Sequence, residues 1–323
     1  MRALRIYEYG EPDVLRLEEL PTPAPGPGLV LVRVAAAGVN FADVQRRKGL
    51  YLEPTALPYG VGIEVSGTVA AVGSGVAGLR EGQRVTGFVR AGYAEYALGR
   101  PQMLFPIPDE LDFERAAALP VQGLTAYHLL RTAARLQARE TVLIHAAAGG
   151  VGLLLTQLAK LMEAGTVYGT ASSTEKQSLA EANGADVTLN YAEHDFVGWI
   201  KENTQGRGVD VVLEAVGGEV TTRSLSCLKP FGRLVNYGRS SGHGEPLDVR
   251  ALTAQNLTVT GFYLTGLLQR SDLVAEGMRA LFDHVASGRL HIVVHPFPLA
   301  EAARAHAALE ERATTGKLVL LPG

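Results

Sequence analysis

A glycine-rich turn at residues 147–152 has the composition and spacing of a turn that binds phosphate. Its sequence is Ala147-Ala148-Gly149-Gly150-Val151-Gly152. The apolar run at 141–146 predicts a buried strand before the turn, and the apolar side of 151–164 predicts a helix after it. This order is typical of dinucleotide binding, because the first N–H groups of the helix face the phosphates. The alternative is an ordinary glycine turn between a strand and a helix.

Each glycine of this turn is expected to have its own steric role. A side chain at Gly149 would hold a pyrophosphate away from the backbone, and one at Gly152 would hold the helix off its strand. The tight bend at Ala147 tolerates a methyl group. We therefore expect residues 149–152 to bind the cofactor together.

Alternating strand and helix patterns follow the turn and predict a doubly wound parallel sheet. The expected strands are 141–146, 166–170, 187–190, 209–213, 232–236 and 257–263, and the expected helices are 151–164, 174–183, 193–204 and 219–228. A ligand would lie at the carboxyl ends of these strands.

The remainder of the chain has a different pattern. Residues 1–120 show short alternating segments separated by Gly and Pro, which predict a β-rich domain. Helices are expected at 113–119, 124–132, 272–287 and 299–312, with a last strand at 317–321. The expected domains are 1–120 with 265–323, and 121–264.

Composition limits the possible partners and locations. The net charge of −3 provides no basic field for nucleic acid or an anionic membrane, and no apolar run reaches the ~20 residues that span a bilayer. Residues 1–10 predict a strand rather than a secretion signal. One cysteine, Cys227, allows no internal disulfide, so we expect a cytoplasmic protein.

Three co-linear motifs carry a resemblance to a known family. They are Ala37-Gly38-Val39-Asn40-Phe41-Ala42-Asp43 with Gly49-Leu50-Tyr51, then Pro120-Val121-Gln122-Gly123-Leu124-Thr125-Ala126, and then the turn at 146–152. The chain resembles the zinc-free quinone oxidoreductases (ζ-crystallin-like) of the medium-chain dehydrogenase/reductase superfamily. The resemblance implies a Rossmann doubly wound parallel six-stranded sheet plus a β-rich GroES-like catalytic domain, and NADPH-dependent reduction of a quinone.

The residues at the zinc positions of the superfamily predict a metal-free site. Zinc-dependent members carry Cys and His where this chain has Asn40 and Phe41, and a further His where it has Ile63. A catalytic zinc needs at least three protein ligands and a structural zinc four. One cysteine and eight scattered histidines do not supply either set in the family's way.

The residues after the second predicted strand favour NADPH over NADH. An NAD-specific fold places an acid about 20 residues past the glycine turn, where this chain has Ser172 and Ser173. Glu175 is expected on the first turn of the next helix, facing solvent. The resemblance implies that Lys176 and Tyr191 meet the 2′-phosphate, with Ser172 leaving room for it. The alternative is a capping serine and a solvated lysine.

Further cofactor contacts are implied by the resemblance alone. Thr125 is expected near the nicotinamide, and Lys317 is expected to approach the cofactor from the C-terminal tail. Asn40 and several residues that follow the later strands complete the set, namely Val216, Gly238, Arg239, Ser240, Phe262 and Leu264. Each of these could instead be an ordinary loop residue.

Three residues are candidates for direct roles in the reaction. The amide of Asn40 could bind a carbonyl of the acceptor or the nicotinamide ribose. Asp43 is either functional or a helix-start carboxylate, and Tyr51 either stacks on a planar ring or is a surface aromatic. Gln45 replaces an aromatic residue of many family members, so the pocket could differ.

Two other functions compete with quinone reduction. A C=C reductase for alkenals or enones would use the same hydride donor but would need a positioned proton donor. A non-enzymatic NADPH-binding scaffold is a third possibility.

The segment 256–264 predicts an assembly. It is the outermost strand of the predicted sheet, with good β propensity and no Pro or Lys. An exposed edge of this kind can pair with its own copy across a two-fold axis, as in related enzymes, so we expect a homodimer. The alternative is a monomer whose tail covers the edge.

Overall fold

The computed structural model describes residues 1–244 and 246–323 and divides into two compact units. The first comprises Met1–Val121, Met278–Ala286 and Ile292–Gly323, and the second comprises Gln122–Gly277 and Ser287–His291. Residues 265–277 and 287–291, expected in the first domain, lie in the second unit, and Val121, expected in the second domain, lies in the first unit. No described helix is both long and apolar enough to cross a lipid bilayer.

The second unit contains a six-stranded sheet in the order β10-β9-β8-β11-β12-β13. All of its pairings are parallel, which confirms the predicted fold class. The strands are β8 (Val142–Ile144), β9 (Val167–Ala171), β10 (Val187–Asn190), β11 (Val209–Glu214), β12 (Leu228–Asn236) and β13 (Thr258–Gly261). Strands β8 and β11 are buried throughout, as their apolar composition predicts for central strands covered on both faces.

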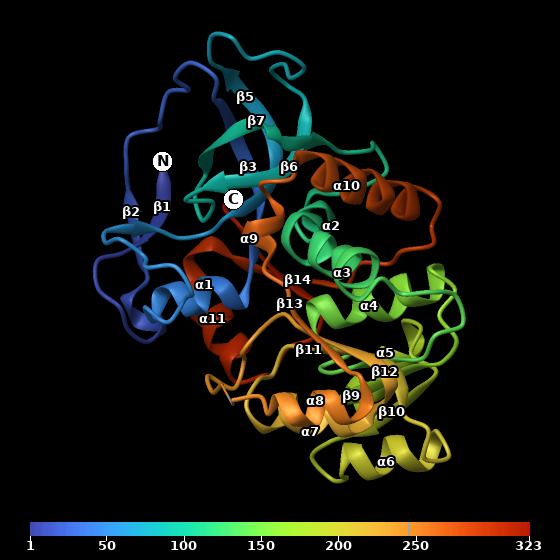
Figure 1. Cartoon of the computed structure of the whole chain (residues 1–323). Helices are drawn as coiled ribbons and strands as arrows, with labels where there is room; N and C mark the ends of the chain where they lie inside the picture. Colours follow the sequence, from blue (N-terminus) through green and yellow to red (C-terminus); the bar gives the residue numbers. More distant parts are fainter. Residues whose placement is uncertain (245) are drawn as a thin grey trace. The chain divides into compact units, whose positions relative to one another are not determined.

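Helices alternate with these strands in the second unit. They are α3 (Leu124–His128), α4 (Gly150–Leu161), α5 (Thr174–Ala182), α6 (Phe196–Asn203), α7 (Glu219–Ser224), α8 (Val249–Gln255) and α9 (Leu264–Leu267). In Figure 1, α4 lies on one face of the sheet, and α6, α7 and α8 lie on the other. This arrangement brings the carboxyl ends of the parallel strands, and the loops that follow them, to one edge of the sheet.

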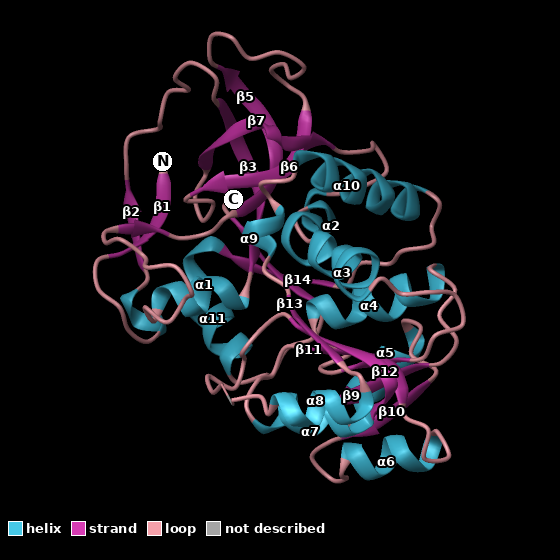
Figure 2. Ribbon diagram, in the orientation of Figure 1, coloured by secondary structure: helices cyan, strands magenta, loops and turns pink. Residues whose placement is uncertain are grey.

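The first unit is rich in strands (Figure 2). One sheet has the order β14-β15-β3-β5-β6-β7, and a further pairing of β3 with β7 closes four of its strands on themselves. These strands are β3 (Val30–Val39), β5 (Glu64–Val72), β6 (Arg84–Arg90), β7 (Tyr96–Pro106), β14 (Val294–Pro298) and β15 (Lys317–Leu321). The valines Val32, Val65 and Val85 belong to the fully buried core that they enclose.

Shorter elements complete the first unit. A three-stranded sheet contains β1 (Arg2–Ile6), β2 (Arg16–Glu19) and β4 (Tyr59–Gly60). The helices are α1 (Phe41–Arg47), α2 (Phe113–Ala116) and α11 (Ala302–Glu310), and α10 (Ser271–Ala286) contributes residues to both units. The antiparallel pairing of β15 with β3 places Leu318 opposite Val39, so Lys317 comes close to the residue that follows β3, which is Asn40.

Several boundaries differ from the sequence prediction for physical reasons. The sequence did not predict β14, because Pro296 and Pro298 interrupt it; its place at the edge of the sheet tolerates residues without an N–H donor. Helix α8 was also missed, because it has only seven residues and none of them is buried. The helix expected at 193–204 begins at Phe196, after an Asp195 cap. The helix expected at 219–228 ends at Ser224, and β12 then begins at Leu228.

Candidate functional site

The glycine turn lies between β8 and α4, as predicted, and Gly152 is confined by backbone. A Cβ atom at Gly152 would collide with the carbonyl oxygen of Ala146 and lie 2.7 Å from that of Ala147. A side chain there would push the first turn of α4 away from the strand. The space at Gly149 is different, because a Cβ atom would meet only the Ala146 oxygen, at 3.2 Å.

The N-terminus of α4 fits an anionic ligand. Helices α5, α6 and α8 begin with side-chain caps from Ser173, Asp195 and Asp248. No side-chain hydrogen bond caps α4 at Gly149, and α4 is the longest of the uncapped helices in this unit, the others being α3, α7 and α9. The first N–H groups of a helix need partners and carry the positive end of its dipole. An uncapped twelve-residue helix that begins at a glycine, with no side chain between its N–H groups and a ligand, therefore suits the pyrophosphate of a dinucleotide.

The structure brings three of the predicted phosphate contacts to the ends of neighbouring strands. Strands β9 and β10 are paired, and the Tyr191 N–H donates to the Ala171 carbonyl at 3.0 Å, beside Ser172. The ammonium of Lys176 donates to the hydroxyl of Ser172 at 3.3 Å. Ser173 caps α5, so part of the capping alternative is observed, and Glu175 is exposed on the first turn as expected. The capping serine is Ser173, so Ser172 is not the cap.

Glu214 is a buried carboxylate that the sequence analysis did not identify. It accepts hydrogen bonds from the N–H of Gly217 at 2.8 Å, from the Thr221 hydroxyl at 2.7 Å and from the Asn236 amide at 2.7 Å, and also from the Val216 N–H. These bonds tie the loop after β11 to the end of β12. The only sequence signal was a single acid at the end of an apolar run.

The remaining predicted cofactor residues of the second unit lie at strand ends or on α3. Ser240 donates its N–H to Ala215 at 2.9 Å, and Phe262 donates its N–H to Asn236 at 2.8 Å, so the loops after β11, β12 and β13 are joined at one edge. Gly238 and exposed Arg239 follow β12, Leu264 begins α9, and Thr125 is buried in α3. Their contacts with a cofactor stay a prediction.

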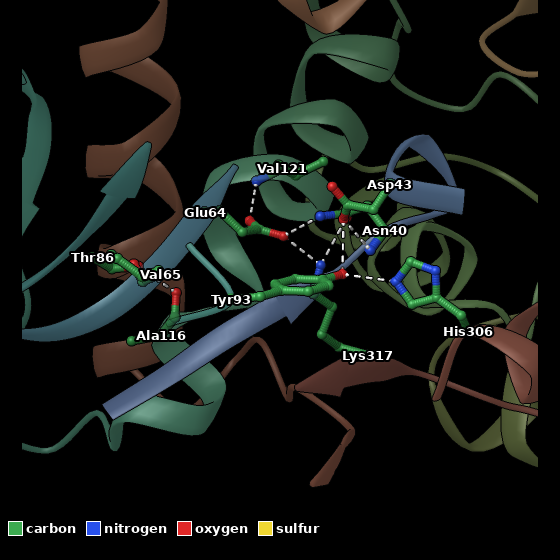
Figure 3. Close-up of polar contacts among 10 residues, drawn as sticks. All are labelled: Asn40, Asp43, Glu64, Val65, Thr86, Tyr93, Ala116, Val121, His306 and Lys317. Carbon is green, nitrogen blue, oxygen red and sulfur yellow. Dashed lines mark hydrogen bonds and ion pairs between the residues drawn. The ribbon is translucent and has the colours of Figure 1, made fainter. Parts of the chain in front are cut away.

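A buried polar cluster in the first unit surrounds Asn40 (Figure 3). Lys317 donates to Asn40 Oδ1 at 2.8 Å, and Asn40 Nδ2 donates to Glu64 Oε1 at 2.6 Å. Lys317 and Glu64 form an ion pair at 2.5 Å, and the second Glu64 oxygen accepts the Val121 N–H at 2.7 Å. The N–H of Asn40 donates to Asp43 Oδ2 at 2.9 Å, and Asn40 is the N-cap residue of α1. The sequence did not indicate Glu64 as a functional residue.

A chain of hydrogen bonds leads from this cluster to Arg47. The Tyr93 hydroxyl donates to Asp43 Oδ2 at 3.2 Å and contacts His306 Nε2 at 3.2 Å (Figure 3). Arg47 contacts His306 Nδ1 at 3.5 Å. Because a guanidinium can only donate, Nδ1 accepts, and Nε2 carries the hydrogen that it donates to Tyr93. Burial and the Arg47 charge lower the pKa of His306 to about 3, so the ring is neutral.

Asp43 is fully buried, and only one of its oxygens is bonded. Among the described residues Oδ2 has two donors, whereas buried Oδ1 has none. Burial raises the pKa of Asp43 from 3.8 to about 6, against the lowering effects of the Asn40 N–H and the Lys317 charge. The neutral acid is therefore favoured far more than for an ordinary aspartate.

Tyr51 lies beside a cation. The guanidinium of Arg46 is 3.9 Å from the centre of the Tyr51 ring, and the ring is half-buried. This contact occupies part of the ring that we expected to stack on a substrate. Arg46 and Tyr51 therefore form one candidate contact surface for a planar ring.

The raised pKa of Asp43 predicts that the free energy of unfolding depends on pH. A carboxyl with a raised folded pKa contributes stability that is complete below its unfolded pKa of 3.8 and is lost as the pH rises through about 6. We expect Asp43→Asn to remove up to about 3 kcal/mol of this pH dependence. Melting curves between pH 4 and pH 8 measure it. Exposed Asp109→Asn is the control, and equal slopes for wild type and Asp43→Asn would contradict the prediction.

No group of three or more metal-ligating side chains occurs within residues 1–244 and 246–323. At the position where zinc-dependent relatives carry a cysteine, the Asn40 amide is bound by Lys317 and Glu64.

Comparisons with known proteins cover the whole chain. Residues 26–109 match the alcohol dehydrogenase GroES-like domain, and residues 150–283 match the family described as zinc-binding dehydrogenase. A quinone oxidoreductase of Pseudomonas aeruginosa is 39% identical over 99% of both chains. A 2-haloacrylate reductase of Burkholderia is 37% identical over 98% of both chains.

A solved structure agrees with these sequences. The Escherichia coli quinone oxidoreductase complexed with NADPH is 36% identical, has a TM-score of 0.95 and aligns over 100% of both chains. The predicted resemblance is thereby confirmed. The chain belongs to the quinone oxidoreductase family of the medium-chain dehydrogenase/reductase superfamily.

Proposed function

We propose that this protein is an NADPH-dependent quinone oxidoreductase. The observation that carries the proposal is the combination, in one sheet, of an uncapped glycine turn at α4 with the Ser172–Lys176 pair at the end of β9. The first feature suits a pyrophosphate and the second suits an additional phosphate on the adenosine ribose. A relative that aligns over the full chain is crystallised with NADPH.

Different groups of residues would bind different parts of NADPH. Gly149, Gly150, Val151 and Gly152 would hold the pyrophosphate, and Ser172, Lys176 and Tyr191 would hold the 2′-phosphate. The remaining contacts would come from the strand-end and α3 residues, namely Thr125, Val216, Gly238, Arg239, Ser240, Phe262 and Leu264. Bound NADPH would supply a hydride, which with a solvent proton converts a quinone to a hydroquinone.

The first unit would supply the acceptor side of the reaction. Asn40 would donate a hydrogen bond to an acceptor carbonyl, and Tyr51 with Arg46 would contact a planar ring. Asp43 would hold the loop after β3 in place through the Asn40 N–H. Hydride transfer to a quinone needs little acid–base machinery, because position and exclusion of water account for most of the protein's part.

Reduction of a C=C bond is the second candidate. A 2-haloacrylate reductase is among the full-length relatives, and such a reaction needs a proton at carbon. Stopped-flow oxidation of NADPH with quinones, enals and enones as acceptors separates the two. Fastest turnover with quinones supports the proposal, and turnover with enones alone would replace it by the second candidate. Binding of NADPH without turnover of any acceptor would favour the scaffold function.

Activity is expected to be independent of metal, because the Asn40 amide is bound by a lysine and a glutamate rather than placed among metal ligands. Overnight chelation followed by assay should leave the rate unchanged. Recovery of lost activity on adding zinc would refute this prediction.

We also propose a homodimer through β13. This strand lies at the edge of the sheet, and its only pairing among the described residues is with β12. Thr258 and Gly261 are exposed, so the outer edge is open to a second copy. A cytoplasmic location remains part of the proposal, because one cysteine permits no internal disulfide.

Substitution in β13 tests the dimer. Val259→Pro removes a ladder donor and should shift the protein toward monomer in light scattering. Val259→Thr keeps the donor and is the matched control. A dimer unchanged by Val259→Pro would place the interface elsewhere.

A further inference from the structure

The carboxamide of Asn40 is held between two buried charges of opposite sign. Lys317 is 1% exposed and Glu64 is fully buried. The ammonium lies 2.8 Å from Asn40 Oδ1 and the carboxylate 2.6 Å from Asn40 Nδ2, and the two charges are 2.5 Å apart (Figure 3). Each of the three side chains therefore contacts both of the others.

This arrangement permits only one orientation of the amide. An ammonium has hydrogens but no acceptor, and a carboxylate has acceptors but no hydrogen. Rotating the amide by half a turn would place an NH₂ group against the ammonium and an oxygen against the carboxylate. The triad thus defines which end of Asn40 is the donor, and it leaves one Nδ2 hydrogen outside the triad.

Stability alone is a weak reason to keep such a triad. A buried ion pair loses in desolvation about what it gains in attraction, and apolar replacements of similar volume are often as stable. The surrounding fold nevertheless makes room for it. A Cβ atom at Gly38 would collide with the Glu64 carboxylate and lie 2.7 Å from Lys317 Cε, so the glycine in β3 provides the space that the pair occupies.

We propose that Lys317 and Glu64 are positioning residues for the reaction: they hold Asn40 so that its remaining Nδ2 hydrogen donates to the acceptor carbonyl. The Lys317 ammonium also polarises the amide, which makes this N–H a stronger donor. The inference rests on the proposed function, and it gives Lys317 a role other than direct contact with the cofactor.

The role matters most at the moment of hydride transfer. A quinone that takes up a hydride gains two electrons and one hydrogen at carbon or oxygen, and negative charge develops on its carbonyl oxygen. A prepositioned donor at that oxygen stabilises the transition state more than the ground state. A proton from solvent then neutralises the oxygen. This completes the hydroquinone when the hydride was added at oxygen, and a hydrogen added at carbon must in addition leave as a proton while the second carbonyl oxygen takes one up.

A double variant removes both charges of the Lys317–Glu64 ion pair, so neither partner is left buried opposite a neutral residue. Lys317→Met with Glu64→Gln keeps the side-chain volumes and avoids a buried isolated charge. We expect kcat with 1,4-benzoquinone to fall about tenfold to hundredfold, as when a donor to a developing oxyanion is weakened. The Kd for NADPH, measured by fluorescence titration, should stay within about twofold of wild type, since the triad is proposed to act on the acceptor.

A second variant leaves every polar group in the protein. Gly38→Ala inserts one methyl group against the pair and should displace it. We expect a fall in kcat of the same kind, again with little change in the Kd for NADPH. Lys229→Met is the matched control, because it breaks a lysine–carboxylate pair with Asp210 near the amino ends of β11 and β12. It should leave both quantities unchanged.

Infrared spectroscopy measures how strongly the protein polarises the carbonyl group of a bound quinone, and it needs no turnover. Isotope-labelled 1,4-benzoquinone bound to the enzyme with NADP⁺ should show a carbonyl stretch shifted to lower frequency in wild type and less shifted in the double variant. A tenfold higher Kd for NADPH with unchanged kcat would overturn the inference and make Lys317 a cofactor contact. Unchanged kcat, Kd and stretch would also overturn it and leave the triad a packing feature.

The proposed function is judged separately, on the wild-type rates with each acceptor. If wild type reduces only enones, the quinone proposal fails, and the same variants and the same carbonyl stretch, measured with an enone, still decide the role of the triad.

Discussion

Gly149→Ala is expected to keep the fold and to weaken NADPH binding at least about thirtyfold, which corresponds to about 2 kcal/mol. The residue has an extended backbone with φ of −75°, which alanine adopts without strain. Its Cβ atom would meet only the Ala146 oxygen at 3.2 Å, so the protein needs no more than a small adjustment. The same methyl group would occupy the space that a pyrophosphate needs against the N-terminus of α4. Melting temperature and fluorescence titration measure the two effects.

Gly152→Ala is the matched comparison. The main expected effect of Gly149→Ala is on cofactor binding, whereas that of Gly152→Ala is on the stability of the protein. Its Cβ atom would collide with backbone oxygen atoms that cannot rotate away. We expect the melting temperature to fall by about 5 °C or more, because overpacking of this kind costs about 1–3 kcal/mol or more. Cofactor binding should weaken as a consequence of the displaced helix. If Gly149→Ala instead bound NADPH as tightly as wild type, the pyrophosphate would not lie at this turn.

Lys176→Ala is expected to weaken NADPH binding at least tenfold and to leave NADH binding nearly unchanged. The ammonium lies beside the Ser172 hydroxyl at the end of β9, and the Tyr191 backbone is bonded to the adjacent Ala171. A charge-assisted contact to a phosphate contributes about 1.5–3 kcal/mol, enough for this ratio. Wild type should accordingly bind NADPH at least tenfold more tightly than NADH.

Exposed Lys201→Ala in α6 is the control for a general loss of positive charge. It should leave the affinities for both cofactors unchanged. Equal dissociation constants of wild type for NADPH and NADH would refute the assignment of Lys176.

The amino-acid sequence by itself determined the local parts of this protein. Gly149 and Gly152 follow a β-branched apolar run and precede a leucine-rich one, so strand, turn and helix could be predicted from neighbouring residues. Two further predictions were correct: Glu175 lies on an exposed first turn, and β13 is the outermost strand. Both depend on short-range periodicity and on the order of the elements, which are properties of the sequence itself. Elements without that signal were missed, as in α8 with no buried residue and β14 with its prolines.

Only the tertiary structure decided which distant residues meet. Lys317 is 277 positions from Asn40, and the antiparallel register of β15 on β3 brings them together. Glu64 comes from β5 and His306 from α11, so neither could be associated with Asn40 or Asp43 by spacing in the chain. Burial is likewise a property of the folded surroundings. Asp43 lies at the start of α1 and accepts the Asn40 N–H, and its burial there raises its pKa to about 6. Sequence patterns report local conformation, whereas the charges, partners and protonation of the site depend on long-range packing, which only the assembled sheets create.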